Sequence, residues 1–111
     1  MAELSIIIPT FNAIRVLGPT LAALAQIEAI GLVKDVVISD GGSTDDTVAA
    51  ARETGAIVVE TQRGRGPQLQ AGADAATGDW LLFLHADTVL APGWADVVRA
   101  FIARPAASEQ A

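Results

Sequence analysis

Residues Trp80–Thr88, WLLFLHADT, carry the strongest structural signal in this chain of 111 residues. The stretch opens with consecutive large apolar residues, Trp80–Leu84, which predict a strand buried on both faces and lying in the middle of a sheet. His85 and Asp87 follow two residues apart, on the same side of an extended chain. We therefore expect a buried strand whose carboxyl end presents a histidine and a carboxylate to a ligand or a metal.

Apolar runs with strand character alternate with helix-like segments along the whole chain. The other predicted strands are Leu4–Ile8, Val33–Ser39 and Ala56–Glu60. The predicted helices start at Pro19, at an approximate capping box of Ser43 and Asp46, at Pro67 and at Trp94, and they cover 19–31, 43–54, 67–77 and 94–103. This alternation predicts an α/β fold, a three-layer Rossmann-like parallel sheet, in one domain over 1–105 with a frayed tail over 106–111.

Polar loops follow three of these strands, namely Pro9–Asn12, Asp40–Asp45 and His85–Thr88. The strand order 3-2-1-4 follows most naturally from right-handed crossovers, and it makes the first and fourth strands neighbours. The chain reverses its winding direction between those two strands, and ligands bind outside the carboxyl ends of the strands at such a point. The three loops therefore predict a ligand site.

The composition excludes several classes of function. The 7 basic and 13 acidic residues give a net charge of −6, which argues against a general nucleic-acid or anionic-membrane binder. There is no cysteine, and no apolar run approaches the ~20 residues that span a bilayer. Glu3 and Pro9 interrupt the first apolar stretch before a signal peptide can form, so we expect a cytoplasmic protein. The phosphate loops of dehydrogenases and P-loop hydrolases are absent, as is a hydrolase nucleophile elbow.

Each candidate site residue also has a purely structural interpretation. Asp87 suits Mg²⁺ or Mn²⁺ bound to substrate phosphates, or it caps the turn that follows. Asp40 could accept hydrogen bonds from a base or ribose, or fix its own loop as an Asx-turn. Arg63 and Arg65 flank a glycine and could bind a phosphate, or belong to a solvated loop. His85 is a ligand or a histidine whose hydrogen bonds are met within the fold.

Four stretches taken together resemble the inverting family 2 glycosyltransferases with the GT-A fold. Pro9–Asn12 is similar to the P-x-[YF]-N turn of that family, and Asp40–Thr47 to its D-[GD]-x-S-x-D-x-T loop. Gly64–Gly72 resembles the G-x-G…N-x-G segment, and Gly78–Thr88 the G-D…[FL]-L-D-x-D block. The His-Ala-Asp-Thr sequence at the end of this block resembles a bacterial subgroup of the arsenosugar-biosynthesis type.

This resemblance implies a site for a nucleotide-sugar donor, typically a UDP-sugar. The residues it places at the donor nucleotide are Pro9, Thr10, Phe11, Asn12, Asp40, Gly41, Arg65, His85 and Ala86. Asp87 matches the second aspartate of D-x-D and would hold Mg²⁺ or Mn²⁺ on the diphosphate, where the metal neutralises charge on the leaving group. His85 stands in place of the first aspartate, which removes one negative charge from the surroundings of the metal.

The family resemblance also implies a second half, about as long again, that carries the acceptor pocket and the general base. No residue of this chain is assigned as that base, so its catalytic residues are unknown. We therefore expect a donor-binding half-domain that transfers a sugar to an unknown acceptor when completed by the second half. The alternative is a non-catalytic nucleotide-sugar-binding module or a degenerate fragment. The unpaired edge of the last strand predicts self-association.

Overall fold

The computed structural model of the chain describes residues 4–28 and 33–87. Its strands are β1 (Leu4–Thr10), β2 (Val33–Asp40), β3 (Ile57–Glu60) and β4 (Trp80–Phe83). They pair in parallel in the order β3-β2-β1-β4, which confirms the predicted order. The helices are α1 (Ile14–Glu28), α2 (Thr47–Glu53) and α3 (Arg65–Ala75). The predicted helix over 94–103 and the tail over 106–111 lie outside the described residues.

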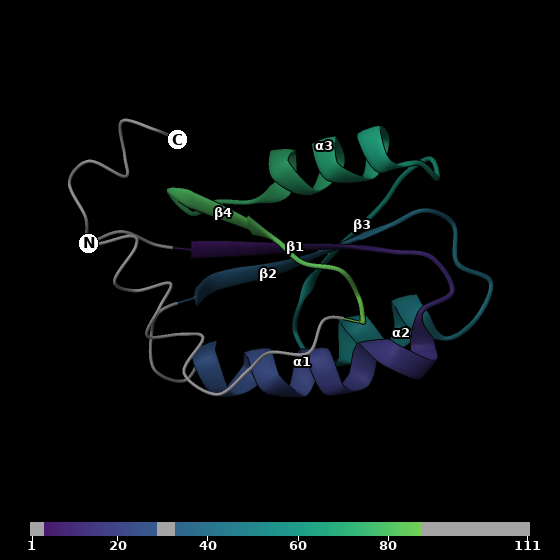
Figure 1. Cartoon of the computed structure of the whole chain (residues 1–111), viewed down its shortest axis with the longest axis horizontal. Helices are drawn as coiled ribbons and strands as arrows, with labels where there is room; N and C mark the ends of the chain where they lie inside the picture. Colours follow the sequence, from purple (N-terminus) through teal and green to yellow (C-terminus); the bar gives the residue numbers. More distant parts are fainter. Residues whose placement is uncertain (1–3, 29–32, 88–111) are drawn as a thin grey trace.

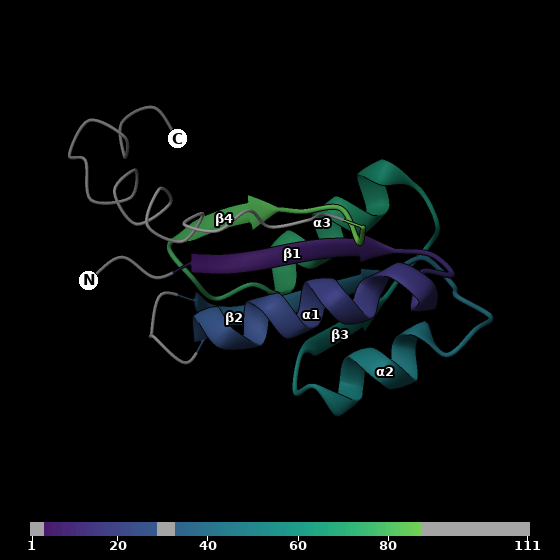
Figure 2. The same cartoon turned by 60° about the horizontal axis from the view of Figure 1, so that its bottom comes forward.

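The helices cover the two faces of the sheet unequally. Figure 1 shows α1 and α2 on one face and α3 on the other, and Figure 2 shows α1 and α2 side by side. Fully buried side chains of β1 and β2, such as Ile6, Ile8 and Ile38, pack against Leu17 and Leu24 of α1. Each such side chain contributes about 1.5–3 kcal/mol by burial. None of the described helices is both long and apolar enough to cross a membrane.

The expectation that Trp80–Leu84 forms a central strand buried on both faces was wrong. Within the described sheet β4 is an edge strand with β1 as its neighbour, and it ends at Phe83. Leu81 and Phe83 are 42% and 45% exposed, whereas Leu82 packs on the core. These two side chains are exposed because α3, the helix on the opposite face from α1, packs mainly against β1, β2 and β3. A run of apolar residues therefore does not distinguish a strand covered on both faces from one covered on a single face.

Two element boundaries that were predicted from prolines were also wrong. Strand β1 runs through Pro9 to Thr10, although Pro9 was expected to stop it. Ile7 O accepts a hydrogen bond from Leu84 N, so the backbone of Ile7 faces β4. The backbone nitrogen of Pro9, two residues later, faces the same side, but there β4 has already ended. Its missing N–H therefore costs no ladder bond. Pro19, expected at the first position of α1, instead lies inside the helix.

Helix α1 begins earlier than predicted because the start of α2 and the loop before it satisfy the N–H groups at the start of α1. Thr47 Oγ1 accepts a hydrogen bond from Ala13 N at 2.9 Å, and Asp45 Oδ2 accepts one from Ile14 N at 3.3 Å. The first N–H groups of a helix lack partners within the helix, so such acceptors stabilise its start. Both acceptors lie more than thirty residues away in sequence, beyond the reach of any local capping rule.

Candidate functional site

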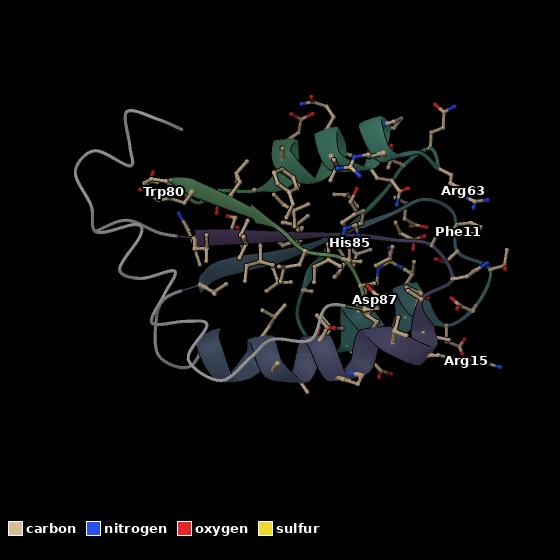
Figure 3. The ribbon with its side chains drawn as sticks, viewed as in Figure 1. Phe11, Arg15, Arg63, Trp80, His85 and Asp87 are labelled. Carbon is tan, nitrogen blue, oxygen red and sulfur yellow. The ribbon has the colours of Figure 1, made fainter. Side chains whose placement is uncertain are left out.

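The polar loops that follow β1, β2 and β4 meet at one end of the sheet, as the strand order predicts. Thr10, the last residue of β1, lies opposite Asp40, the last residue of β2. Figure 3 shows Phe11, Arg63 and Asp87 toward this end, far from Trp80 at the start of β4. Of the residues expected at the donor, Thr10, Asp40 and Gly41 are buried, Pro9 and Ala86 are half-buried, and Phe11, Asn12, Arg65, His85 and Asp87 are exposed.

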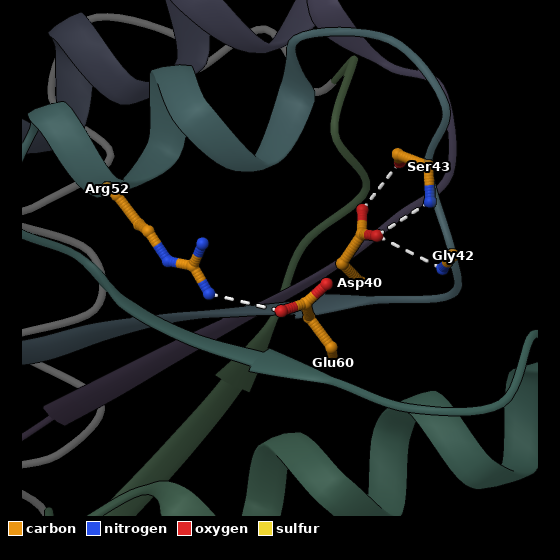
Figure 4. Close-up of polar contacts among 5 residues, drawn as sticks. All are labelled: Asp40, Gly42, Ser43, Arg52 and Glu60. Carbon is orange, nitrogen blue, oxygen red and sulfur yellow. Dashed lines mark hydrogen bonds and ion pairs between the residues drawn. The ribbon is translucent and has the colours of Figure 1, made fainter.

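Asp40 is fully buried and its carboxylate accepts four hydrogen bonds, of which Figure 4 shows those from Gly42 and Ser43. Thr10 Oγ1 and Ser43 Oγ donate to Oδ1 at 2.7 and 2.6 Å, and the backbone N–H groups of Gly42 and Ser43 donate to Oδ2 at 3.0 and 2.8 Å. Burial raises the pKa of Asp40, but the hydrogen bonds from Ser43, Thr10 and Gly42 outweigh it and leave the pKa below its ordinary value. These contacts match the Asx-turn interpretation, so Asp40 remains charged and holds the loop.

The loops after β1 and β2 are joined to each other by further hydrogen bonds. Asn12 Oδ1 accepts from Thr44 N at 2.7 Å, and Asn12 N donates to Ser43 Oγ at 2.8 Å. Asn12 has a φ of 48°, a left-handed conformation that asparagine adopts more readily than most residues. Ser43 and Asp46 do not form the expected capping box, because Ser43 binds Asp40 and Asn12 instead. Asp45 accepts hydrogen bonds from Thr47, and the Thr47 hydroxyl holds the pKa of Asp45 below its ordinary value.

An exposed aromatic ring and a guanidinium lie together at the outer edge of these loops. The guanidinium carbon of Arg63 lies 3.9 Å from the centroid of the Phe11 ring, within the range of a cation–π interaction. Phe11 is 36% exposed and was expected to line a nucleobase pocket. Arg63 was noticed in the sequence only as part of a basic cluster. No signal in the sequence paired it with Phe11, since the two residues belong to loops after different strands.

A pocket of about 340 Å³ brings three of the expected donor residues together. Its lining is Pro9, Arg65, Leu69, Phe83, Leu84 and His85. The guanidinium of Arg65 and the imidazole of His85 come from α3 and from the segment after β4, and both are suited to an anion such as a phosphate. A second pocket, between α1 and α2, has a volume of about 400 Å³ and is lined by uncharged residues, so it lacks that chemistry.

The segment after β4 presents one carboxylate next to α1. Thr20 Oγ1 donates to Ala86 O at 2.9 Å, which ties the turn at Ala86 and Asp87 to α1. Because the chain turns there, strand alternation no longer relates the side chains of His85 and Asp87. Within 4–28 and 33–87, no group of three or more His, Cys, Asp or Glu side chains could hold a metal ion. Asp87 fits Mg²⁺ or Mn²⁺ only if diphosphate oxygens and water complete the coordination.

Gln68 lies beneath these loops; it belongs to the family-like segment Gly64–Gly72, but the sequence assigned it no role. Gln68 is 7% exposed, and its side chain forms hydrogen bonds with the ends of β1 and β2 and with the loop that leads into α3. A polar residue on the buried side of a short helix was the signal that could have revealed it. Gly72, one turn further along α3, is the other close approach, because a Cβ there would overlap the side chain of Ile7.

Comparison with known proteins identifies relatives of this arrangement. The family model described as glycosyl transferase family 2 matches residues 5–108. A PGL/p-HBAD biosynthesis glycosyltransferase of Mycobacterium tuberculosis is 41% identical over 93 residues, which cover 78% of this chain and 36% of that protein. A glucosyl-3-phosphoglycerate synthase of Mycolicibacterium smegmatis is 30% identical over 94 residues, 77% of this chain and 31% of that protein. The chain thus spans about a third of the length of these curated relatives.

Solved structures share the same fold. Glucosyl-3-phosphoglycerate synthase from Mycobacterium tuberculosis, in complex with Mn²⁺, UDP and glucosyl-3-phosphoglycerate, superposes with a TM-score of 0.71 at 27% identity, over 79% of this chain and 34% of that one. Mannosyl-3-phosphoglycerate synthase from Rubrobacter xylanophilus superposes with a TM-score of 0.75 at 21% identity, over 83% and 33% of the two chains. The second likeness establishes the fold alone.

Proposed function

The chain belongs to glycosyl transferase family 2, and on that premise we propose that its strand ends bind a nucleotide-diphosphate sugar, in the first instance a UDP-sugar, with Mg²⁺ or Mn²⁺. The observation that carries this proposal is the pocket in which Pro9, Arg65 and His85 meet. These residues come from three distant parts of the chain, and the pocket combines an apolar wall with two nitrogen-bearing side chains. Such a combination suits the diphosphate of a sugar nucleotide.

The base and the diphosphate would occupy different parts of the site. We assign the base to the exposed edge around Phe11, where an aromatic ring can stack on it. Arg65 and His85 would contact the phosphates, and Asp87 would hold the metal against them. Asp40 would support the site indirectly by holding its loops in place, because its oxygens already bind Thr10, Gly42 and Ser43. When bound, the metal would supply Lewis-acid stabilisation of charge on the leaving nucleoside diphosphate.

Relatives support this choice of ligand and metal. The glucosyl-3-phosphoglycerate synthase of Mycobacterium tuberculosis has been solved with Mn²⁺ and UDP, and also with Mn²⁺, UDP-glucose and phosphoglyceric acid. That enzyme is 27% identical to this chain over the superposed part. The proposal for this chain takes from that enzyme a UDP-sugar as the donor and a divalent cation as the metal, and it names no acceptor.

Sugar transfer itself is proposed only together with the acceptor-binding half that the family resemblance implies. An inverting hexosyl transfer needs a general base at the acceptor hydroxyl, and no described residue is assigned that role. Membership of the arsenosugar-biosynthesis-type subgroup, a bacterial source and a cytoplasmic location stay predictions. The alternative of a non-catalytic nucleotide-sugar-binding module or a degenerate fragment is not favoured, because the curated relatives are named as a glycosyltransferase and a synthase.

Ligand-dependent stability tests the donor site. UDP with Mn²⁺ at one hundred times its dissociation constant should raise the free energy of unfolding by about 2.7 kcal/mol. Replacing Asp87 by Asn should remove the part that depends on the metal and leave the part due to UDP alone. The control is Asp74→Asn, an exposed carboxylate on α3 that binds Gln70. Failure of every nucleoside diphosphate to stabilise the chain with metal would refute the proposal.

A further inference from the structure

A buried glutamine joins the loops of the proposed donor site. We infer that Gln68 is a positioning residue that fixes the spacing between the base-binding edge and the phosphate pocket, and thereby sets the affinity for a whole nucleoside diphosphate. This inference rests on the proposed function, which supplies the two halves of the ligand. It adds a residue that contacts neither half and acts through the backbone of the loops that do.

The side-chain amide of Gln68 binds three different segments. Its Nε2 donates to Thr10 O at 2.8 Å and to Ser39 O at 3.0 Å, at the carboxyl ends of β1 and β2. Its Oε1 accepts a hydrogen bond from Gly64 N at 3.1 Å, in the loop that leads into α3. Both N–H groups and the oxygen of the amide are therefore engaged, which leaves this buried side chain fully satisfied.

The backbone of Gln68 strengthens the same junction. Ser39 Oγ donates to Gln68 O at 2.6 Å, and Gln68 N donates to Gly64 O at 3.0 Å. Ser39 is completely buried, so this contact is shielded from water. A hydrogen bond whose partner is removed leaves a buried polar group unsatisfied, which is costly. The first turn of α3 is thus held against the strand ends at several points.

Each segment bound by Gln68 lies next to a residue of the proposed site. Thr10 precedes Phe11, and Ser39 precedes the pair Asp40 and Gly41. Gly64 lies between Arg63, which stacks on Phe11, and Arg65, which lines the pocket. One side chain therefore connects the edge assigned to the base with the wall assigned to the phosphates.

Close packing around Gly41 shows that the position of the Gln68 amide is tightly constrained. A Cβ on Gly41 would lie 2.9 Å from Cδ and from Oε1 of Gln68, and 3.0 Å from the backbone Cα of Arg63. The Gln68 amide would have to move if Gly41 were replaced by a residue with a side chain. Glycine at this position thus allows the loop after β2 to lie directly against Gln68.

The spacing that Gln68 fixes affects how much the base and the diphosphate gain from binding as one connected ligand. A rigid site binds a two-part ligand far more tightly than either part, because the second contact is made at a high effective concentration. If the spacing between the two subsites relaxes, each part can still bind but the advantage of their connection decreases. Loss of the Gln68 amide should therefore weaken UDP much more than it weakens uridine or pyrophosphate alone.

The test compares Gln68→Met with Gln70→Met, in the full chain with Mg²⁺ and at a temperature where circular dichroism shows every variant folded. Methionine keeps the length of the side chain and removes its hydrogen bonds. Gln70 lies on the same helix, is exposed and binds Asp74, so it provides the matched control. Calorimetry should show UDP binding weakened about tenfold or more by Gln68→Met, with uridine and pyrophosphate each within about twofold and Gln70→Met unchanged.

Other outcomes overturn the inference in distinguishable ways. Equal UDP affinity in the Gln68→Met variant and the unsubstituted chain, or an equal loss for UDP, uridine and pyrophosphate, would reduce Gln68 to a structural role. No UDP binding by the unsubstituted chain would overturn the proposed function and this inference with it. If Gln68→Met does not fold, Gly41→Ala displaces the amide from the other side. Gly18→Ala is the control, because a Cβ at Gly18 would meet no atom within 4 Å outside the neighbouring backbone of its own helix. The same selective loss for UDP is then expected, and its absence refutes the inference.

Discussion

Asp40 is charged and fully buried, a combination that a protein tolerates only when hydrogen bonds replace the lost water. Its four donors come from Thr10, Gly42 and Ser43, so Asp40 stabilises the carboxyl ends of both β1 and β2. The sequence suggested an Asx-turn at this position and also a contact to a nucleobase. The geometry favours the turn, because both carboxylate oxygens are already occupied.

Replacing Asp40 by Asn should lower the free energy of unfolding by about 2–3 kcal/mol at neutral pH. The amide turns one acceptor into a donor that faces other donors. The lowered pKa of Asp40 means that the unfolded chain takes up a proton before the folded chain does. The stabilisation by this charge is therefore complete above about pH 4 and disappears as the pH falls further through the folded pKa.

Chemical denaturation of both proteins between neutral pH and pH 2 measures this prediction. The difference between the unsubstituted chain and Asp40→Asn should shrink as the solution becomes more acidic. Asp46→Asn is the control, since its exposed side chain forms no cap hydrogen bond and should change the stability by less than about 0.5 kcal/mol. A difference that is the same at every pH would show that the charge of Asp40 does not stabilise the fold.

Among the elements, the position of α3 depends on the absence of a side chain at Gly72. A Cβ at this position would overlap the side chain of Ile7 in β1, so Gly72→Ala should push α3 off the sheet. We expect a loss of about 1–3 kcal/mol, as for overpacking of a core. Thermal unfolding measures it against Gly18→Ala on α1, where the added methyl meets nothing within 4 Å. Equal melting temperatures for the two variants would contradict the close packing of α3.

The edge strand β4 carries a second prediction. Leu81 and Phe83 are exposed beside an edge that has no described neighbour, and such edges promote pairing with other chains. We propose that the isolated chain self-associates through β4 and that Leu81→Lys reduces this association. Val16→Lys is the matched control, since Val16 on α1 is also 42% exposed. Light scattering at high concentration should show smaller particles only for Leu81→Lys, and a monomeric unsubstituted chain would refute the proposal.

Element boundaries show where local sequence patterns stop being informative. The strands were found from their apolar runs because burial between helix layers requires such residues over several positions. The starts of α1 and α2 were wrong because Asn12, Ser43 and Asp45 exchange hydrogen bonds between loops. The prediction that β4 is buried on both faces was wrong because the position of α3 determines which strands are covered. These contacts are set by the tertiary structure, and no capping or periodicity rule contains them.

For the whole molecule, the order of the strands was predictable because right-handed crossovers leave few arrangements. That order alone places the loops after β1, β2 and β4 at one end of the sheet. The residues expected at the donor therefore assemble near one another without any knowledge of their side-chain contacts. The parts that sequence did not predict, Arg63 against Phe11 and Gln68 beneath the loops, depend on side-chain packing at that end.

Amide ¹H–¹⁵N spectra of the chain, titrated with UDP and Mg²⁺, show directly whether UDP binds at the carboxyl ends of the strands. We predict that the signals of Phe11, Gly41, Arg65 and His85 shift together and saturate at one ligand concentration. The signals of Leu21 and Ala50, which line the pocket between α1 and α2, should stay in place. Shifts confined to that second pocket, or no shifts at any concentration of UDP, would contradict binding of UDP at the carboxyl ends of β1, β2 and β4.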